Sequence, residues 1–252
     1  MMKLPVLFTK EVELAAKAHA KLCYPEESCG IVVDGKYLAM KNVAADKLND
    51  FMIDPAKLVD VEVQAIIHSH PNADPVPSSA DMRGQMDSAV PWGVFTVVKD
   101  EFGEYAFSQI LWFGDQVPKL PLVGRPFVHG FTDCYAIIRD VYKEELGIEL
   151  LDFPRDWDWW LNDQNLYTEG FAKTGFREIQ QHELKKYDVV LSCLGLRSGI
   201  ANHGSVYYGN ETVIHHIAAK SPVDFGRVST IVPAAPFLRR AVHFLRHKDM
   251  DK

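Results

Sequence analysis

A stretch in the middle of the chain separates two halves that are each patterned like a domain. The segment Gly114–Pro126 carries three prolines, and its apolar residues follow no clear period. Such stretches commonly connect domains, which usually contain about 100–150 residues. The 252 residues therefore predict two domains, 1–114 and 127–252, joined by a proline-rich linker over 115–126.

The first half has the patterning of a mixed α/β domain. The pair Asp34-Gly35 marks a hairpin between two apolar runs. A helix is expected over 54–66, with proline in its first turn, leading into an apolar strand near 65–68. Another helix is expected to begin at Ser78, and β-rich segments follow it.

The second half repeats this alternation of helix and strand signals. A helix is expected over 133–146, and strands are expected over 189–193, 203–208 and 212–217. An amphipathic C-terminal helix over 236–246 is expected to close the chain. The whole chain is therefore expected to be an α+β protein of two domains.

Composition and charge narrow the classes of function. With 47% hydrophobic and 24% charged residues the chain is ordinarily globular, and its net charge of −7 argues against gripping nucleic acid phosphates. No segment approaches the roughly 18 apolar residues that span a bilayer, and the N-terminus lacks a secretory pattern. We therefore expect no membrane span, reduced cysteines and a cytoplasmic chain, unless something other than an export signal carries it out.

Two histidines and one aspartate are spaced as ligands of a catalytic metal. His68 and His70 flank one residue at a strand end, so their imidazoles point the same way. Asp81 lies one turn inside the helix that begins at Ser78. Two His and one Asp leave the fourth position of tetrahedral zinc for water, which is typical of a catalytic site. Glu27, just before the first strand, is the candidate base, and Ser78 could stabilise an oxyanion.

Each of these features also has an ordinary structural explanation. Ser78 and Asp81 have the spacing of a capping box, which is usually a helix cap and nothing more. A His-x-His pair at a strand end is often structural, and Glu27 beside Glu26 is typical of a solvated turn. The combined spacing, with an upstream Glu-x-Cys-Gly, favours a metal site over these separate explanations.

The combined pattern resembles the motif of the JAMM (MPN+) metallopeptidases over about Leu7 to Phe113. That resemblance implies an α/β domain with a mixed sheet and a Zn²⁺ cofactor. It implies zinc ligation by His68, His70 and Asp81, general acid/base work by Glu27 and oxyanion stabilisation by Ser78. Eukaryotic members of that family cut ubiquitin isopeptide bonds, but nothing in this sequence identifies such a substrate.

A cysteine in the second half lies at the start of a predicted helix. Cys134 follows Thr132 and Asp133, either of which is a suitable N-cap. A thiol in the first turn lies at the positive end of the helix dipole, which favours the thiolate. Cys134 is therefore a candidate nucleophile, although a buried first-turn cysteine is usually just a small hydrophobic residue.

Two histidines on successive strands are the candidate partners of this thiol. His203 and His215 flank a turn at Gly209-Asn210-Glu211. A three-residue turn pairs Ser205 with His215 and places His203 diagonally on the same face, whereas a two-residue turn brings His216 opposite His203. One imidazole could then activate the thiol while the other orients it, and a purely structural sheet edge stays open as the alternative.

The order of these residues is similar to the NlpC/P60 pattern over about Leu122 to Ile217. Asp-Cys opens a helix, and after a long gap His-Gly-Ser-Val-Tyr-Tyr-Gly-Asn is followed by Val-Ile-His. The resemblance implies a papain-like α+β domain that cleaves cell-wall peptides. It implies Cys134 as nucleophile, His203 as base and His215 as the third member of a triad.

One departure from that family lies upstream of the cysteine. Many members carry a tyrosine there whose hydroxyl contacts the catalytic centre, and this chain has Phe127-Val128-His129-Gly130 instead. His129 is one substitute, and a different way of stabilising the oxyanion is the alternative. Between nucleophile and base lies an aromatic group that could be a substrate wall, a partner surface or a core cluster, namely Trp157, Trp159, Trp160 and Tyr167.

The succession of the two patterns is similar to the tail assembly protein K family of long-tailed phages. Gly-Arg-Pro-Phe-Val-His-Gly before Asp133-Cys134, and Phe-Leu-Arg-His near the end, support it. The resemblance implies a virion protein of the phage tail tip, assembled with other tail tip proteins in the host cytoplasm. It implies cleavage of the peptidoglycan stem peptide, with the γ-D-glutamyl–diaminopimelate bond as the family's preference, and a zinc site of unknown target. A structural plug or docking module with latent sites, and a cytoplasmic isopeptidase, are the alternatives.

Overall fold

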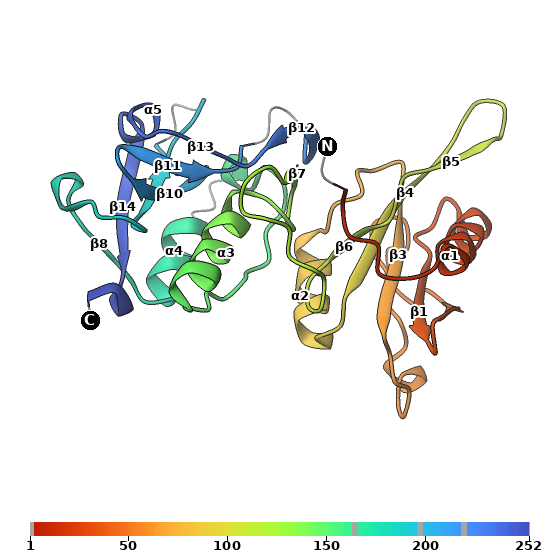
Figure 1. Cartoon of the computed structure of the whole chain (residues 1–252). Coiled ribbons are helices and arrows are strands. Elements are labelled where there is room, and N and C mark those ends of the chain that lie inside the picture. Colours follow the sequence, from red (N-terminus) through yellow and green to blue (C-terminus); the bar gives the residue numbers. More distant parts are fainter. Residues whose placement is uncertain (1–2, 163–165, 196–198, 218–220, 252) are drawn as a thin grey trace. The chain divides into compact units, whose positions relative to one another are not determined.

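The computed structural model describes residues 3–162, 166–195, 199–217 and 221–251. The chain divides into two compact units, Lys3–Lys119 (unit 1) and Leu120–Lys252 (unit 2). This division falls inside the proline-rich stretch in which the sequence predicts a linker. Each unit contains helices and a sheet of its own (Figure 1), which confirms the predicted α+β class.

The sheet of unit 1 has six strands. Their bounds are β1 Cys29–Val33, β2 Lys36–Met40, β3 Ala65–Pro71, β4 Trp92–Lys99, β5 Tyr105–Phe107 and β6 Leu111–Phe113. The order is β2-β1-β3-β4-β5, and β6 also pairs with β4. β3 and β4 are parallel while the other pairs are antiparallel, so the expected mixed sheet is confirmed. The β1–β2 hairpin turns at Asp34 and Gly35, as predicted.

Two helices accompany this sheet. α1 (Lys10–Cys23) packs one apolar face against the strands. α2 (Ser79–Ser88) begins at the predicted N-cap Ser78 and packs against β4, where Trp92 donates from Nε1 to Ser88 Oγ at 2.9 Å. The first turn of α2 lies beside β3, where Asp81 is close to the imidazoles of His68 and His70.

The helix expected over 54–66 is wrong. The structure has a single 3₁₀ turn, η1 (Pro55–Lys57), followed by non-helical residues up to β3. Valines at alternate positions from Val59 to Val63 have the period of an extended chain, and Asp60 adopts a positive φ of 61°. The proline therefore starts one turn and not a helix.

The main sheet of unit 2 also has six strands, all antiparallel. Their bounds are β8 Phe176–Glu178, β9 Val189–Ser192, β10 His203–Gly209, β11 Thr212–His215, β13 Thr230–Pro233 and β14 Ala241–His247. The order is β13-β11-β10-β9-β14-β8, and β7 (Pro126–Val128) pairs separately with β12 (Val223–Val228). The three predicted strands are the neighbours β9, β10 and β11.

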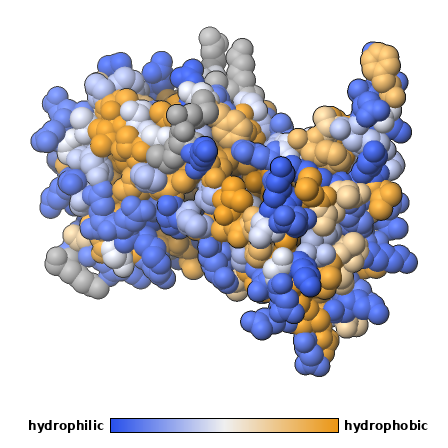
Figure 2. Space-filling model, turned by 45° about the vertical axis from the view of Figure 1, so that its right-hand side comes forward, coloured by the Kyte–Doolittle hydropathy of each residue, from blue (hydrophilic) through white to orange (hydrophobic). Residues whose placement is uncertain are grey.

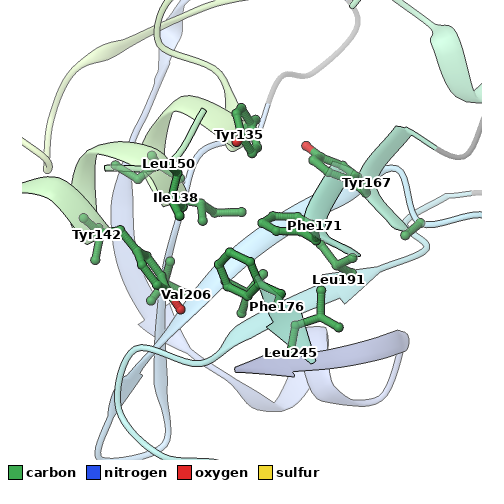
Figure 3. Close-up of a cluster of buried hydrophobic side chains, with 14 of the residues drawn as sticks. Tyr135, Ile138, Tyr142, Leu150, Tyr167, Phe171, Phe176, Leu191, Val206 and Leu245 are labelled. Atoms are coloured by element: carbon green, nitrogen blue, oxygen red, sulfur yellow. The ribbon is translucent and has the colours of Figure 1, made fainter. Parts of the chain in front are cut away.

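A helix packs across the middle of this sheet. α3 (Cys134–Leu146) follows its N-cap Asp133, one of the two residues that the sequence favours as a cap, and contacts β10 and β11. Gly204 on β10 permits this close approach, because a Cβ there would lie 2.6 Å from Cδ1 of Ile138. A cluster of buried side chains fills the space between α3, α4 (Leu166–Lys173) and the strands (Figure 3).

The helix expected over 236–246 at the end of the chain is also wrong. The structure has one helical turn, α5 (Ala235–Leu238), and then the strand β14. β14 pairs with β9 on one side and β8 on the other, and Arg246 forms a buried ion pair with Asp188. These partners lie far away in the sequence, so the local amphipathic pattern did not reveal them. The remaining 3₁₀ turns are η2 Trp159–Asn162, η3 Gln181–Glu183 and η4 Lys248–Asp251.

Within the described part of the chain, no helix is both long and apolar enough to cross a membrane. On the face drawn in Figure 2, hydrophobic side chains form separate groups bordered by hydrophilic ones. Each unit also buries its own set of hydrophobic side chains.

Candidate catalytic sites

Three side chains of unit 1 bring their donor atoms together at one point. The Nε2 atoms of His68 and His70 are 3.1 Å apart, and they lie 3.4 Å and 3.5 Å from the two carboxylate oxygens of Asp81. Ligands bound to zinc at about 2.0–2.1 Å in a tetrahedron are about 3.3 Å apart, so these separations fit a cation of that size. Imidazole and carboxylate are also donors that zinc prefers. The three predicted ligands thus form a group that can hold a metal.

Contacts behind the two imidazoles fix their orientation. His70 Nδ1 lies 2.9 Å from the carbonyl oxygen of Asp74, and the tautomer that donates to this oxygen leaves Nε2 free for a metal. His68 is fully buried, and its ring stacks on Phe51 at a centroid distance of 4.6 Å. Its Nδ1 has no hydrogen-bond partner among the described residues. Packing orients His68, and a backbone hydrogen bond orients His70.

Glu27 and Ser78 lie next to this group. Glu27 is buried, and its Oε1 atom is 3.9 Å from His70 Nε2. Burial raises the pKa of Glu27 to about 8, and His70 opposes that shift. Ser78 Oγ accepts from the Asp81 N–H at 3.1 Å and the Ser78 N–H donates to Asp81 Oδ2 at 2.8 Å, which completes a capping box. The Ser78 hydroxyl also donates to Asp81 Oδ2 at 2.8 Å. Ser78 thus orients a candidate ligand, and its contact with an oxyanion stays a prediction.

Cys134 opens α3 in unit 2 with its sulfur close to two hydrogen-bond donors. The Sγ atom lies 2.7 Å from the hydroxyl oxygen of Tyr167 and also accepts from the backbone N–H of Gly204. Burial raises the pKa of the thiol to about 11, and Asp133 adds to the shift while the two donors oppose it. The thiol is therefore protonated at neutral pH until a base takes its proton.

The two predicted histidines lie on the same face of the sheet. Ser205 pairs with His215, and the ring centroids of His203 and His215 are 5.4 Å apart. This is the register predicted for a three-residue turn, but the chain reaches it with a two-residue turn after Gly209 and a bulge before it. His215, and not His216, therefore shares the face of His203.

Both imidazoles are neutral in this environment. Burial lowers the pKa of His203 well below its ordinary value, with His215 adding to the shift, and burial lowers the pKa of His215 to about 4. His203 Nε2 and His215 Nδ1 have no hydrogen-bond partner within the described ranges. A neutral imidazole with a free ring nitrogen is the form that a general base needs.

A cavity of about 540 Å³ lies beside the thiol. Cys134 and His203 both line it, and Phe127 and Trp157 contribute aromatic walls. The Phe127 ring meets the edge of Trp157 at a centroid distance of 6.2 Å. The predicted nucleophile and base therefore share one cavity, whereas His215 is not among the described residues that line it.

Asp133 anchors the start of α3 next to the thiol. Its carboxylate accepts from three backbone N–H groups and pairs with the buried guanidinium of Arg155 at 2.8 Å. His129, one of the two alternatives for the missing tyrosine hydroxyl, is buried, and its Nε2 lies 3.1 Å from the Arg155 carbonyl oxygen. Within the described ranges, the hydrogen bond of His129 goes to this carbonyl oxygen and not to the Cys134 sulfur.

Sequence reasoning missed the position of Tyr167. The residue belonged to an aromatic group without assigned chemistry, yet its hydroxyl contacts the sulfur of Cys134 across 33 positions of sequence. Of that group, Trp159 and Tyr167 belong to the core and Trp157 lines the cavity, while the side chain of Trp160 lies outside what the structure describes. The sequence contains one indication of this contact: the tyrosine hydroxyl that many family members have upstream of the cysteine is missing, so another tyrosine could supply it.

Two family models match the chain, one in each unit. The model of the prokaryotic homologs of the JAB domain matches residues 9–110, and the model of the NlpC/P60 family matches residues 124–239. The first range contains His68, His70 and Asp81, which could hold a metal, and the second contains Cys134 with both histidines. The chain therefore carries a JAB-like domain followed by an NlpC/P60 domain.

Two phage proteins are similar to the chain along much of its length. Tail tip assembly protein K of Escherichia phage lambda is 38% identical over 156 residues, which cover 62% of this chain and 70% of that protein. Tail tip assembly protein K of Escherichia phage N15 is 29% identical over 248 residues, which cover 94% of each. Among solved structures, an NlpC/P60 family protein from Bacillus cereus has a TM-score of 0.34 at 12% identity, covering 95% of this chain and 67% of that one.

Proposed function

The chain belongs to the family of the tail tip assembly protein K, and on that premise we propose that its unit 2 cleaves amide bonds of the peptidoglycan stem peptide. The observation that carries the proposal is that Cys134 and His203 line the same cavity. His203 Nε2 has no hydrogen-bond partner among the described residues, so it is free to accept a proton. A thiol at a helix start and a base in the same cavity are the minimum for a thiol peptidase. The match of residues 124–239 to the NlpC/P60 family supports this function.

In the proposed reaction, His203 first takes the proton of the Cys134 thiol, and the resulting thiolate attacks the amide carbonyl carbon. The tetrahedral adduct collapses to a thioester, and the amine leaves with the proton that His203 returns. Water, deprotonated by His203, then releases the carboxylic acid and restores the thiol. His215 does not line the cavity, so its proposed role is to position the ring of His203. The proposed bond is the γ-D-glutamyl–diaminopimelate amide.

Unit 1 is proposed to be a second peptidase, acting on a protein of the assembling tail. His68, His70 and Asp81 would hold a zinc ion, which when bound supplies Lewis-acid activation of water and carbonyl groups. Glu27 would move a proton between water and the leaving amine. Ser78 would orient the Asp81 carboxylate through its hydroxyl hydrogen bond. To donate to an oxyanion instead, the Ser78 hydroxyl would have to give up this bond to Asp81.

The proposed place of action is the tail tip of a phage particle. Both phage relatives are named as tail tip assembly proteins, so we place the chain with other tail tip proteins, assembled in the host cytoplasm. At that location a stem-peptide endopeptidase would open the cell wall locally.

The test of unit 2 uses the purified full-length chain on isolated sacculi, with released peptides identified by mass spectrometry. Wild type should release stem peptides, and Cys134→Ala should lower the rate by about 1,000-fold or more, because the nucleophile is lost. Cys193→Ala is the matched control, since it removes another thiol of unit 2 and should leave the rate unchanged. Release by Cys134→Ala at the wild-type rate would overturn the thiol mechanism.

The test of unit 1 measures metal binding by native mass spectrometry. Wild type should bind one zinc ion, and His70→Ala should lose that binding. The same variant should cleave sacculi as wild type does, because His70 belongs to unit 1. Failure of wild type to bind zinc would reject the metal site.

A structural role at the tail tip is the second candidate, and one observation favours it. Burial leaves the Cys134 thiol and the His203 imidazole both neutral, so no preformed ion pair awaits a substrate. A plug or docking module with latent sites needs no such pair. This alternative predicts that Cys134→Ala supports infection as well as wild type does, which a complementation assay with phage lacking the chain would measure.

A further inference from the structure

The hydroxyl of Tyr167 meets the sulfur of Cys134 from a different element. Tyr167 lies in α4, its Oη atom is 2.7 Å from Cys134 Sγ, and 2% of its surface is exposed. Figure 3 shows Tyr167 at the edge of the buried cluster, beside Phe171. The ring belongs to the core, and the residue also lines the cavity that contains the thiol.

The ring of Tyr167 is held by aromatic neighbours. It stacks on Phe171, with centroids 6.0 Å apart and an interplanar angle of 21°, and it meets the edge of Trp159 at 5.2 Å. A phenylalanine at this position would keep both contacts. The hydrogen bond to sulfur is therefore not needed to place the ring, and its position against the nucleophile has a chemical consequence.

The proton of this hydrogen bond lies on the tyrosine whenever the cysteine is ionised. Burial raises the pKa of Tyr167 well above its ordinary value, and the adjacent Cys134 adds to the shift. The phenol therefore stays protonated and donates to the sulfur, as does the backbone N–H of Gly204. Hydrogen bonds to a charged acceptor are the stronger kind, so both donors favour thiolate over thiol.

We propose that Tyr167 is a catalytic residue of the thiol site, whose hydroxyl donates a hydrogen bond to the Cys134 thiolate and raises its population before attack. The catalytic use of this bond rests on the proposed peptidase function, while the bond itself rests on the contact at 2.7 Å. His203 takes the thiol proton, the phenol keeps its own, and no bond to the tyrosine forms or breaks. Because the buried resting thiol is protonated at neutral pH, a larger thiolate fraction raises the rate of attack.

The test measures the ionisation of Cys134 in the full-length chain. The rate of its alkylation by iodoacetamide is followed across a pH series by mass spectrometry of the peptide that contains it. The midpoint of the curve of alkylation rate against pH reports the ionisation of the Cys134 thiol. In Tyr167→Phe we expect this midpoint to rise by about one pH unit, with alkylation at neutral pH about tenfold slower. Stem-peptide cleavage should fall by a similar factor. The midpoint, unlike the rate, does not depend on access of the reagent.

Tyr142→Phe is the matched control. Tyr142 is buried in the same cluster, but its hydroxyl donates to the Tyr187 carbonyl oxygen at 2.7 Å and not to the sulfur. Its loss should leave the Cys134 midpoint where it is in wild type. A general loosening of the core would instead move the midpoint in both variants, and that result would overturn the proposal.

An unchanged midpoint in Tyr167→Phe also overturns it. Should circular dichroism show that this variant is unfolded, 3-fluorotyrosine at position 167 keeps the ring and makes the phenol a stronger donor. The Cys134 midpoint should then fall, and an unmoved midpoint rejects the proposal. Alkylation needs no substrate, so a shifted midpoint in a chain that leaves sacculi intact rejects the peptidase function while retaining the hydrogen bond.

Discussion

Asp133 links the fold of unit 2 to the chemistry of its thiol. The carboxylate caps α3 and pairs with the buried Arg155, whose guanidinium also contacts Asp152. The negative charge of Asp133 disfavours a thiolate at Cys134, and the positive charge of Arg155 acts in the opposite direction. The ion pair therefore holds the start of the helix and also limits how far the carboxylate opposes ionisation of the thiol.

Asp133→Asn should lower the free energy of unfolding of α3 by about 3 kcal/mol, because a buried guanidinium loses a charged partner. Hydrogen exchange of the α3 amides, read by mass spectrometry, measures this change. Burial acts to raise the pKa of Asp133, but Arg155 holds it well below its usual range. The stabilisation is therefore complete above about pH 4 and is lost as the pH falls below that value.

The gap in stability between wild type and Asp133→Asn should accordingly narrow below about pH 4. A gap that stays constant in acid would contradict the ion-pair account. Glu149→Gln is the control, because it breaks an exposed ion pair with Lys143 that solvent screens, so the stability should hardly change.

His216 should make the stability of unit 2 depend on pH in a range close to neutrality. The side chain is buried, and burial lowers its pKa to about 4. The folded-state pKa of His216 is below the unfolded value of about 6.5. The stability that neutral His216 contributes to unit 2 is therefore complete above about pH 6.5 and is lost toward pH 4. Between pH 7 and pH 5, wild type should lose about 2 kcal/mol more stability than His216→Gln does.

The measurement is urea unfolding at both pH values, with hydrogen exchange assigning the transition to unit 2. His182→Gln, which removes an exposed imidazole of the same unit, is the control and should keep the wild-type pH dependence. Equal losses in wild type and His216→Gln would show that His216 is not the titrating group.

At the scale of elements, the contact between α3 and β10 positions the nucleophile. Gly204→Ala would place a Cβ 2.6 Å from Ile138 Cδ1, so the helix must move away from the strand. We expect a loss of stability of about 1–3 kcal/mol, as for other overpacked cores, together with slower alkylation of Cys134. Gly226→Ala is the control, because its nearest neighbour is the side-chain Oδ1 of Asp224 at 3.3 Å. Thermal unfolding and alkylation of both variants decide the question.

Local signals predicted the elements whose determinants are adjacent in sequence. The caps at Ser78 and Asp133 lie directly before α2 and α3, and the turn at Asp34 lies between the strands that it joins. The end of the chain was different. The strand β14 is amphipathic in isolation, and its pairing with β9 and β8 outweighs the helical pattern that the sequence displays.

The candidate sites divide in the same way. His68, His70 and Asp81 lie within a short stretch, so spacing alone predicted that their donor atoms converge. The pairing of β10 with β11 was predicted from the turn between them, although a bulge and a shorter turn produce it. The contact of Tyr167 with Cys134 depends on how α4 packs beside α3, and no local pattern encodes that packing.

Each candidate site is built from residues of a single unit. His68, His70 and Asp81 all belong to unit 1, whereas Cys134 and its partners all belong to unit 2. Each unit also has its own sheet, so neither site needs a strand from the other unit. A ligand that binds one site should therefore raise the free energy of unfolding of the unit that contains this site and not of the other unit.

Zinc should protect unit 1 and leave the protection of unit 2 unchanged. At a free zinc concentration of about 100 times Kd, binding stabilises the folded state by about 2.7 kcal/mol, which corresponds to roughly 100-fold slower hydrogen exchange through global unfolding. The slowing should appear in peptides from β3 and α2 of wild type, be reversed by a chelator, and be absent in His68→Ala. Peptides from α3 and β10 are the internal control in every sample. Equal slowing in both units would contradict separate sites, and slowing that persists in His68→Ala would place the zinc elsewhere in the chain.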